Sequence, residues 1–230
     1  MESLPRPDLL VCEVNETLSD LAPMAGRFAA VGLDPLLVRG WFASLLRDGM
    51  ALAVHGERAP FAELARASLE ALLRSAAPDR DPREAVEQVL AGFLALPVHP
   101  DVVEGVRELA GLGIRLVTMS NGAVAVAERL LGGAGLGEHF ERMLSVEQAG
   151  YFKPDPRAYH YAVAECGVPP GEAMLVAVHP WDTDGARRAG LSSAWIDRGD
   201  GGYPSYFLPP TVTADSLVGL AGQLASRAGH

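Results

Sequence analysis

Short apolar runs that alternate with helical patterns are the feature of this sequence that most constrains its fold. The runs stand at residues 9–13 (LLVCE), 114–119 (IRLVTM), 142–146, 173–178 (AMLVAV) and 193–196. A strand that is buried on both faces has a continuous apolar sequence, and alternating strands and helices build a parallel sheet. We therefore predict an α/β fold with a doubly wound parallel sheet.

A second block of the chain, residues 21–96, contains helical patterns and no convincing strand. Its predicted helices are 23–31, 35–52, 61–75 (FAELARASLEALLRS) and 82–94, with apolar residues at spacings of three and four. Between and after the strands we predict helices at 101–112, with Asp101 as its N-cap, and at 123–131, 156–165, 181–189 and 215–226. The chain is thus predicted to divide into an α/β core, residues 1–20 and 97–230, and an all-helical insertion, residues 21–96.

The composition restricts the class of protein and its partners. With 230 residues, 49% of them hydrophobic and 21% charged, the chain resembles an ordinary globular protein. The formal net charge is −10 and no run of Lys or Arg occurs, which predicts binding to neither nucleic acid nor a membrane surface. Residues 1–8 lack the features of a signal peptide, so we expect a cytoplasmic protein. Cys12 and Cys166 are predicted to be buried thiols rather than a disulfide or metal ligands.

One residue stands out by its rarity. The chain has 19 basic residues, and Lys153 is the only lysine among them. A compact ammonium on a flexible stem fits a tight site where a planar guanidinium does not. Lys153 is therefore a candidate functional residue, with chance survival of a single lysine as the alternative.

Polar side chains follow the ends of four predicted strands. They are Glu13, Asn15 and Thr17 after the first, Ser120 and Asn121 after the second, Lys153 after the third, and His179 and Asp182 after the fourth. In an open parallel sheet the carboxyl ends of the strands meet at one edge, where ligands bind. A carboxylate beside a lysine, a hydroxyl and an amide suits nucleophilic catalysis with an anion-positioning loop.

Four segments carry a resemblance to a known family. CEVNETLSD, TMSNG, GYFKPDPRAY and HPWDTDGARRAG resemble, in order and spacing, the signature segments of the haloacid dehalogenase-like superfamily. The likeness covers nearly the whole chain, places the helical block where that family carries its cap, and is greatest to the 2-haloacid dehalogenase branch. It implies a Rossmann-like α/β core with an inserted helical cap.

The sequence departs from that family at two positions. Glu13 stands where the family has a nucleophilic Asp, and its carboxylate is one methylene further from the backbone. Displacing a reacting group by about 1 Å can cost about 100-fold in rate. Asn15 stands where the family's phosphatases have an acid/base Asp, and an amide cannot transfer a proton in that way.

The resemblance also implies roles for the remaining residues. Lys153 would orient the Glu13 carboxylate, Asp182 would hold Lys153, Thr17 would hydrogen-bond Glu13, and Ser120 with Asn121 would bind substrate oxygens. The alternative for Lys153 with Asp182 is an ordinary salt bridge, and for Ser120 with Asn121 a helix-capping turn.

Weaker candidates for substrate binding come from the same comparison. Tyr159 matches an active-site tyrosine, with a surface aromatic as the alternative, and His179 stands where the haloacid enzymes have an amide. Trp41 and Arg47 lie on the cap segment where an apolar wall and a carboxylate-binding arginine are expected. Phe42 is an alternative occupant of the arginine position, and a solvated Arg47 is the simpler interpretation.

Three functions are compatible with these residues. The one we favour is a metal-independent hydrolase that uses Glu13 to break a carbon–heteroatom bond of a small haloacid, epoxide or aziridine, a reaction that needs no cofactor. The second is a catalytically degenerate binding protein of the same fold. The third is a phosphatase in which Glu13 and Asp182 or Asp184 bind Mg²⁺. The expected partner is a small-molecule substrate, with a homodimer through the apolar cap helices as a further possibility.

Overall fold

The structure, a computed structural model, describes residues 6–77, 81–199 and 201–227. A six-stranded sheet forms its centre, and all neighbouring strands in it are parallel. The strands are β1 (Leu9–Cys12), β2 (Arg115–Ser120), β3 (Arg142–Ser145), β4 (Ala173–Ala177), β5 (Ser192–Ile196) and β6 (Val212–Ala214), in the spatial order β3-β2-β1-β4-β5-β6. The predicted parallel α/β fold is thus confirmed.

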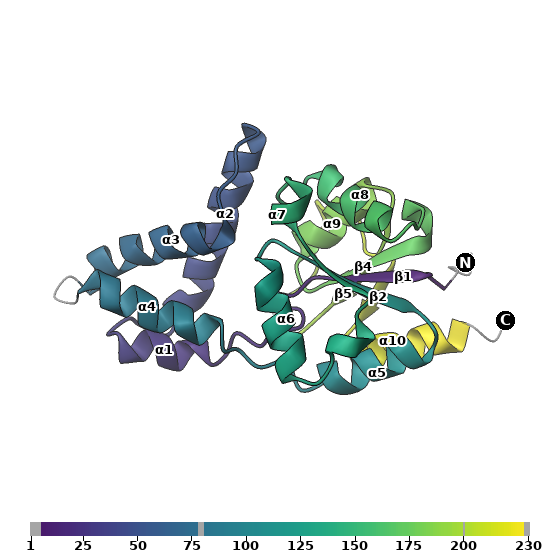
Figure 1. The fold of residues 1–230 in the computed structure, drawn as a ribbon, viewed down its shortest axis with the longest axis horizontal. Coiled ribbons are helices and arrows are strands. Elements are labelled where there is room, and N and C mark those ends of the chain that lie inside the picture. The colour runs from purple at the N-terminus through teal and green to yellow at the C-terminus, as the bar shows by residue number, and fades with distance from the viewer. Residues whose placement is uncertain (1–5, 78–80, 200, 228–230) are drawn as a thin grey trace.

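Helices cover both faces of this sheet, and four further helices lie to one side of it (Figure 1). One face packs against α5 (Val102–Gly111), α6 (Val124–Gly133) and α10 (Leu217–Arg227). The other face packs against α7 (Val146–Ala149), α8 (Pro156–Glu165) and α9 (Pro180–Arg188). Two single-turn 3₁₀ helices, Gly137–His139 and Pro170–Glu172, lie in the connections.

Strand β1 shows why its sequence is apolar throughout. Leu9 and Val11 belong to the hydrophobic cluster on one face of the sheet, and Leu10 and Cys12 to the cluster on the other. Successive side chains of a strand point to opposite faces, so a strand covered on both faces needs an apolar residue at every position. The first polar side chain, Glu13, follows directly after the strand, at its carboxyl end.

The helical cap consists of α1 (Met24–Ala30), α2 (Leu37–Val54), α3 (Phe61–Ala76) and α4 (Pro82–Phe93). Its core contains the aromatic rings of Phe28, Trp41 and Phe93, and the Trp41 ring centroid lies 5.6 Å from that of Phe28 and 6.0 Å from that of Phe93. The apolar centre of the cap is continuous with the hydrophobic cluster on one face of the sheet. The division of the chain at residues 20/21 and 96/97 stays a prediction.

The two segments that connect the cap to the sheet lie side by side. Ser19 and Val98 form an antiparallel bridge, and the amide of Asp20 donates a hydrogen bond of 2.8 Å to the carbonyl of Pro97. Both ends of the cap therefore leave the sheet at one place.

Asp101 does not cap α5 as the sequence predicted. Its backbone is helical (φ −81°, ψ −13°) and its side chain makes no capping hydrogen bond. The carboxylate instead accepts hydrogen bonds from Arg198 Nη1, at 2.9 Å, and from the amide of Leu217, at 2.7 Å. Burial alone would raise the pKa of Asp101, but these two donors lower it overall. The Asp101 carboxylate, which we expected to cap α5, therefore binds the Arg198 guanidinium and the first backbone amide of α10.

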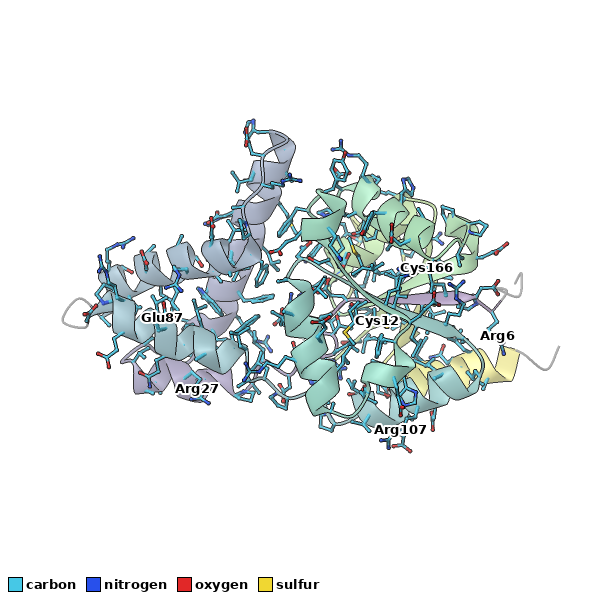
Figure 2. The ribbon with its side chains drawn as sticks, in the orientation of Figure 1. Arg6, Cys12, Arg27, Glu87, Arg107 and Cys166 are labelled. Atoms are coloured by element: carbon cyan, nitrogen blue, oxygen red, sulfur yellow. The ribbon has the colours of Figure 1, made fainter. Side chains whose placement is uncertain are left out.

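Both cysteines are buried and unpaired, as predicted (Figure 2). Cys12 ends the central strand and Cys166 follows α8. Burial, with a smaller contribution from the adjacent Glu13, raises the pKa of the Cys12 thiol to about 12. Among the helices that the structure describes, none is long and apolar enough to cross a membrane.

Candidate active site

Glu13 lies at the carboxyl end of β1 with its side chain only 3% exposed. Its amide donates to the carbonyl of Val176 on β4, at 3.0 Å, which continues the pairing of the two strands beyond Cys12. Its Oε1 accepts hydrogen bonds from the backbone N–H of Asn15, at 3.0 Å, and from Ser120 Oγ, at 3.2 Å. Its Oε2 contacts Lys153 Nζ. The carboxylate is thus held from two sides by three donors.

Lys153 is completely buried and its ammonium lies between two carboxylates, those of Glu13 and Asp182. The Nζ–Oδ2 distance to Asp182 is 2.6 Å, and the backbone amide of Lys153 donates to Asn121 Oδ1 at 3.0 Å. Burial on its own would lower the pKa of Lys153, but the two carboxylates outweigh it and raise the pKa above the ordinary value. The ammonium therefore stays charged at neutral pH.

Asp182 connects this ion pair to α8 and α9, two helices on one face of the sheet. It lies in the first turn of α9, where a carboxylate is favoured by the helix dipole. Its Oδ1 accepts a hydrogen bond of 2.6 Å from the hydroxyl of Tyr159 on α8. Burial raises the pKa of Asp182 even though Lys153 opposes this effect. Tyr159 is fully buried rather than a surface aromatic, and it reaches Asp182 rather than Glu13.

The carboxyl end of β2 supplies Ser120, its last residue, and Asn121, which follows it. The Ser120 hydroxyl donates to Glu13 and accepts from the Gly122 amide, at 3.0 Å, and from Asn15 Nδ2, at 3.2 Å. A hydroxyl has one donor and two acceptor positions, so Ser120 is saturated. Asn121 differs, because its buried Nδ2 has no partner among the described residues. A buried amide donor of this kind suits an acceptor on a ligand.

Three of the predicted site residues are placed elsewhere. The Thr17 hydroxyl accepts from the amide of Val178, at 3.1 Å, and Glu13 is held by Ser120 instead. Trp41 is buried inside the cap, where its Nε1 donates to a carbonyl of α3. Arg47 has a side chain that is 71% exposed and pairs with Asp48 beside it.

His179 is the predicted site residue with the most distinctive surroundings. Its Nε2 lies 2.7 Å from Glu16 Oε2, and its buried Nδ1 has no partner among the described residues. Its ring stacks on Phe42 of the cap, at 6.4 Å between centroids, and on Trp181 of α9, at 5.3 Å. The imidazole therefore joins the cap to the edge of the sheet.

Sequence reasoning did not single out Glu16, which pairs with His179 across 163 positions. Its φ of 59° lies in the left-handed region that side chains other than glycine rarely adopt. The available signal was its position, since it follows β1 and His179 follows the neighbouring strand β4.

The acidic groups that the phosphatase hypothesis assigns to Mg²⁺ are not arranged as that hypothesis expects. Asp184, which that hypothesis assigned to Mg²⁺, pairs with Arg188 at 2.8 Å and accepts from the amide of Leu208 at 2.9 Å. Within residues 6–77, 81–199 and 201–227, no three His, Cys, Asp or Glu side chains are grouped as metal ligands.

The amino-acid sequence is similar to a known family and to several of its characterised members. A sequence model of the haloacid dehalogenase-like hydrolases matches residues 16–190. The phosphoserine phosphatase of Thermus thermophilus is 35% identical over 141 residues, which are 61% of this chain and 56% of that protein. An (S)-2-haloacid dehalogenase of Pseudomonas putida is 27% identical over 143 residues, 62% of this chain and 63% of that one. The matched part thus spans less than two thirds of either relative.

Similarity in structure extends over nearly the whole chain. The crystal structure of a dehalogenase with an intermediate complex has a TM-score of 0.89 and 26% identity to this chain. The match covers 96% of this chain and 98% of that one.

Proposed function

This chain belongs to the haloacid dehalogenase-like hydrolases, and on that premise we propose that it breaks a carbon–heteroatom bond of a small electrophile through a covalent ester of Glu13. The family resemblance drawn from the four sequence segments is confirmed by the matching family model and the structural neighbours. The proposal goes beyond them in naming Glu13 as the nucleophile and haloacids, epoxides or aziridines as candidate substrates.

One observation carries the proposal: the only lysine of the chain is completely buried and holds the Glu13 carboxylate at the carboxyl end of the central strand. A carboxylate must be ionised to attack carbon, and a cation within a few ångströms keeps a buried carboxylate ionised. A purely structural ion pair would also be buried. A structural ion pair would not require, in the adjacent loop, a buried amide donor such as Asn121 Nδ2 that has no partner among the described residues.

The reaction proceeds in two steps. A Glu13 oxygen attacks the electrophilic carbon, and the carbon–heteroatom bond breaks with its electron pair leaving on the heteroatom, to which Asn121 Nδ2 donates a hydrogen bond. A halide leaves as the free ion, whereas the anionic oxygen or nitrogen of an opened epoxide or aziridine takes a proton from the solvent. Water then attacks the ester carbonyl of Glu13, which releases an alcohol, a proton and the free carboxylate. Asp182, whose pKa is raised by burial, accepts that proton. Neither step needs a metal or a cofactor.

Mass spectrometry tests the ester directly. The protein is incubated with 2-chloropropionate, 2-chloropropionamide or propylene oxide, quenched in acid and digested. We expect the mass increase on the peptide containing Glu13, and none in Glu13→Gln, where the amide is a poor nucleophile. Full turnover in Glu13→Gln refutes the proposal.

Isotope labelling gives a second, independent readout. In H₂¹⁸O, each hydrolysis of the ester at its carbonyl carbon places ¹⁸O in the Glu13 carboxylate. After many turnovers the Glu13 peptide is therefore expected to carry ¹⁸O. Product formation without ¹⁸O in Glu13 would show that water attacks the substrate directly.

The likeness to a phosphoserine phosphatase favours phosphoryl transfer as a second candidate. Asn15 opposes it, because the amide cannot supply the proton that a leaving alkoxide needs. Release of phosphate from p-nitrophenyl phosphate that depends on Mg²⁺ would support this candidate. Absence of an adduct with every electrophile, together with ligand binding that persists in Glu13→Ala, would favour a binding protein instead.

A further inference from the structure

One face of the cap helix α2 lies against the core beside the site. Phe42, on this helix, stacks on His179, which follows β4, at 6.4 Å between ring centroids. Gly49 lies seven residues later, and residues seven apart share a face of a helix. The ring of Phe152, in the loop between α7 and α8, lies against Gly49. The same face of α2 thus meets the segment after β4 and the loop that carries Lys153.

Gly49 provides the space that the Phe152 ring occupies. A Cβ on Gly49 would lie 2.5 Å from Cζ of that ring and 2.8 Å from both of its Cε atoms. Carbon atoms in contact are about 3.5–4.0 Å apart, so any larger residue at this position would displace the ring. Glycine destabilises the interior of a helix relative to alanine, and Gly49 lies inside α2. The end of the ring is therefore fitted to the backbone of the cap helix.

Phe152 directly precedes Lys153, and the two side chains reach different parts of the molecule. The ring of Phe152 meets the cap, whereas the ammonium of Lys153 meets Glu13 and Asp182 of the core. Phe152 is only 8% exposed and belongs to the hydrophobic cluster that the cap and the sheet share. Because such interiors are close-packed, a displaced ring finds little free space, and its backbone moves with it.

The other contacts of this loop are made by exposed groups. The guanidinium of Arg58, in the connection after α2, lies 2.7 Å from the place that a Cβ on Gly150 would take. The guanidinium of Arg157 lies 3.9 Å from the ring centroid of Tyr151. Arg58 and Arg157 are both exposed to solvent, where contacts of charged side chains contribute little. The buried ring of Phe152 is therefore the main apolar anchor of the loop.

We propose that Phe152 is a positioning residue, whose ring, seated against Gly49 of the cap, holds the Lys153 ammonium at the Glu13 carboxylate. Phe152 acts through Lys153, because the packed ring fixes the loop and the loop fixes the ammonium. The consequence for the reaction rests on the proposed function of Glu13. The position of the ammonium is measurable without any reaction.

Nuclear magnetic resonance of the single lysine measures that position. Protein labelled with ¹³C at lysine Cε gives one such signal, because Lys153 is the only lysine. Glu13 and Asp182, which also accepts a hydrogen bond from Tyr159, raise the pKa of Lys153 against the effect of burial. The native signal should therefore titrate above the ordinary value of about 10.4. In Gly49→Ala the ammonium moves away from the carboxylates and burial prevails, so we expect titration below that value.

Gly40→Ala is the matched control for this variant. Gly40 lies on the same helix at an exposed position, with no atom within 4 Å of the new Cβ, so the Lys153 signal should titrate as in the native protein. A purely structural role of Phe152 would lower the melting temperature of Gly49→Ala and leave the titration of the folded protein as in the native one. That result overturns the inference.

A compensating pair tests the contact itself. Phe152→Leu shortens the side chain and leaves a gap beside Gly49, which should also lower the pH at which Lys153 titrates. In the double variant Gly49→Ala, Phe152→Leu the new methyl group fills that gap, so we expect the native titration to return. Native titration in whichever single variant folds, or no recovery in the double variant, overturns the inference.

The rate of adduct formation at Glu13 separates this inference from the proposed function. With saturating 2-chloropropionamide, we expect Gly49→Ala to react about 10- to 100-fold more slowly than Gly40→Ala, with little change in the half-saturating concentration. Equal rates in the two variants overturn the inference and leave the proposed function intact. If the native protein forms no adduct while the titrations differ as expected, the ester mechanism is overturned and the positioning of Lys153 by Phe152 is supported.

Discussion

Replacing Lys153 by Met removes the cation between two buried carboxylates and provides a quantitative test of the site. The side chains of Glu13 and Asp182 are 3% and 0% exposed, so they would remain buried without a partner. Removing one member of a buried ion pair typically costs about 3–5 kcal/mol. Folded domains are stable by about 5–15 kcal/mol, so Lys153→Met should lower the free energy of unfolding by a large fraction of the total.

The pH dependence of this loss has a definite sign. Burial raises the pKa of Asp182, and removing the ammonium removes the charge that opposes this effect, so the folded variant binds a proton at Asp182 that the unfolded chain, with an aspartate pKa of about 4, releases. The stability of Lys153→Met therefore falls as pH rises above about 4, and its deficit is smallest in acid. In the native protein the raised pKa of Lys153 contributes stability below the ordinary lysine value of about 10.4, and this is lost as pH rises through the folded pKa.

Urea denaturation followed by tryptophan fluorescence measures the free energy of unfolding of Lys153→Met and of the native protein, and the difference between them, at pH values from 4.5 to 8. The matched control is Lys153→Met in the Glu13→Gln, Asp182→Asn background, where no buried charge is left without a partner and the loss should largely disappear. A loss below about 1 kcal/mol at pH 7, or an equal loss in both backgrounds, would refute the buried ion cluster.

Three further predictions concern packing, charge and reactivity. Gly185→Ala places a Cβ 2.5 Å from the Tyr159 hydroxyl, so it should destabilise the protein by about 1–3 kcal/mol. Gly132→Ala adds a Cβ in open space on α6 and should stabilise the protein by about 0.5–1 kcal/mol. Urea denaturation shows whether each variant lowers or raises the free energy of unfolding. Asp101→Asn should cost about 2 kcal/mol at pH 7, because the lowered pKa of this carboxyl stabilises the fold above about pH 4 and that contribution is lost in acid; thermal melts of both proteins from pH 3 to 7 should converge at low pH. The pKa of about 12 predicts that iodoacetamide at pH 8 modifies Cys12 only after denaturation, and peptide mass spectrometry on native protein showing rapid alkylation there would contradict its burial.

The apolar runs predicted most of the fold because each strand is buried on both faces. The predicted helix 156–165 coincides with α8, whose start is marked by Asp155 as N-cap and Pro156 in the first turn. Strand β6 and helix α7 were not predicted. Each has only three or four residues, which is too few to show a periodic pattern of apolar residues. Strand β6 is defined by its pairing with β5.

The site was predictable to the extent that topology determines it. The carboxyl ends of all strands in a parallel sheet lie at one edge, and this rule places Glu13, after β1, and Lys153, after β3, at the same edge, although β2 lies between the two strands. The cap residues were less predictable, because Trp41, Phe42 and Arg47 lie on one helix, α2, that has apolar residues around much of its circumference. Only the packing of the neighbouring helices decides that Trp41 faces inward and Arg47 faces solvent.

The single lysine of this chain also makes the site observable by simple chemistry. Because its amine is sealed inside the folded molecule, an acylating reagent for primary amines has no ε-amino group to reach until the cluster around it opens. The rate at which that one position becomes acetylated therefore reports how often the interior is exposed. A ligand that bridges the cap and the sheet should lower the rate of acetylation of Lys153 in proportion to its occupancy.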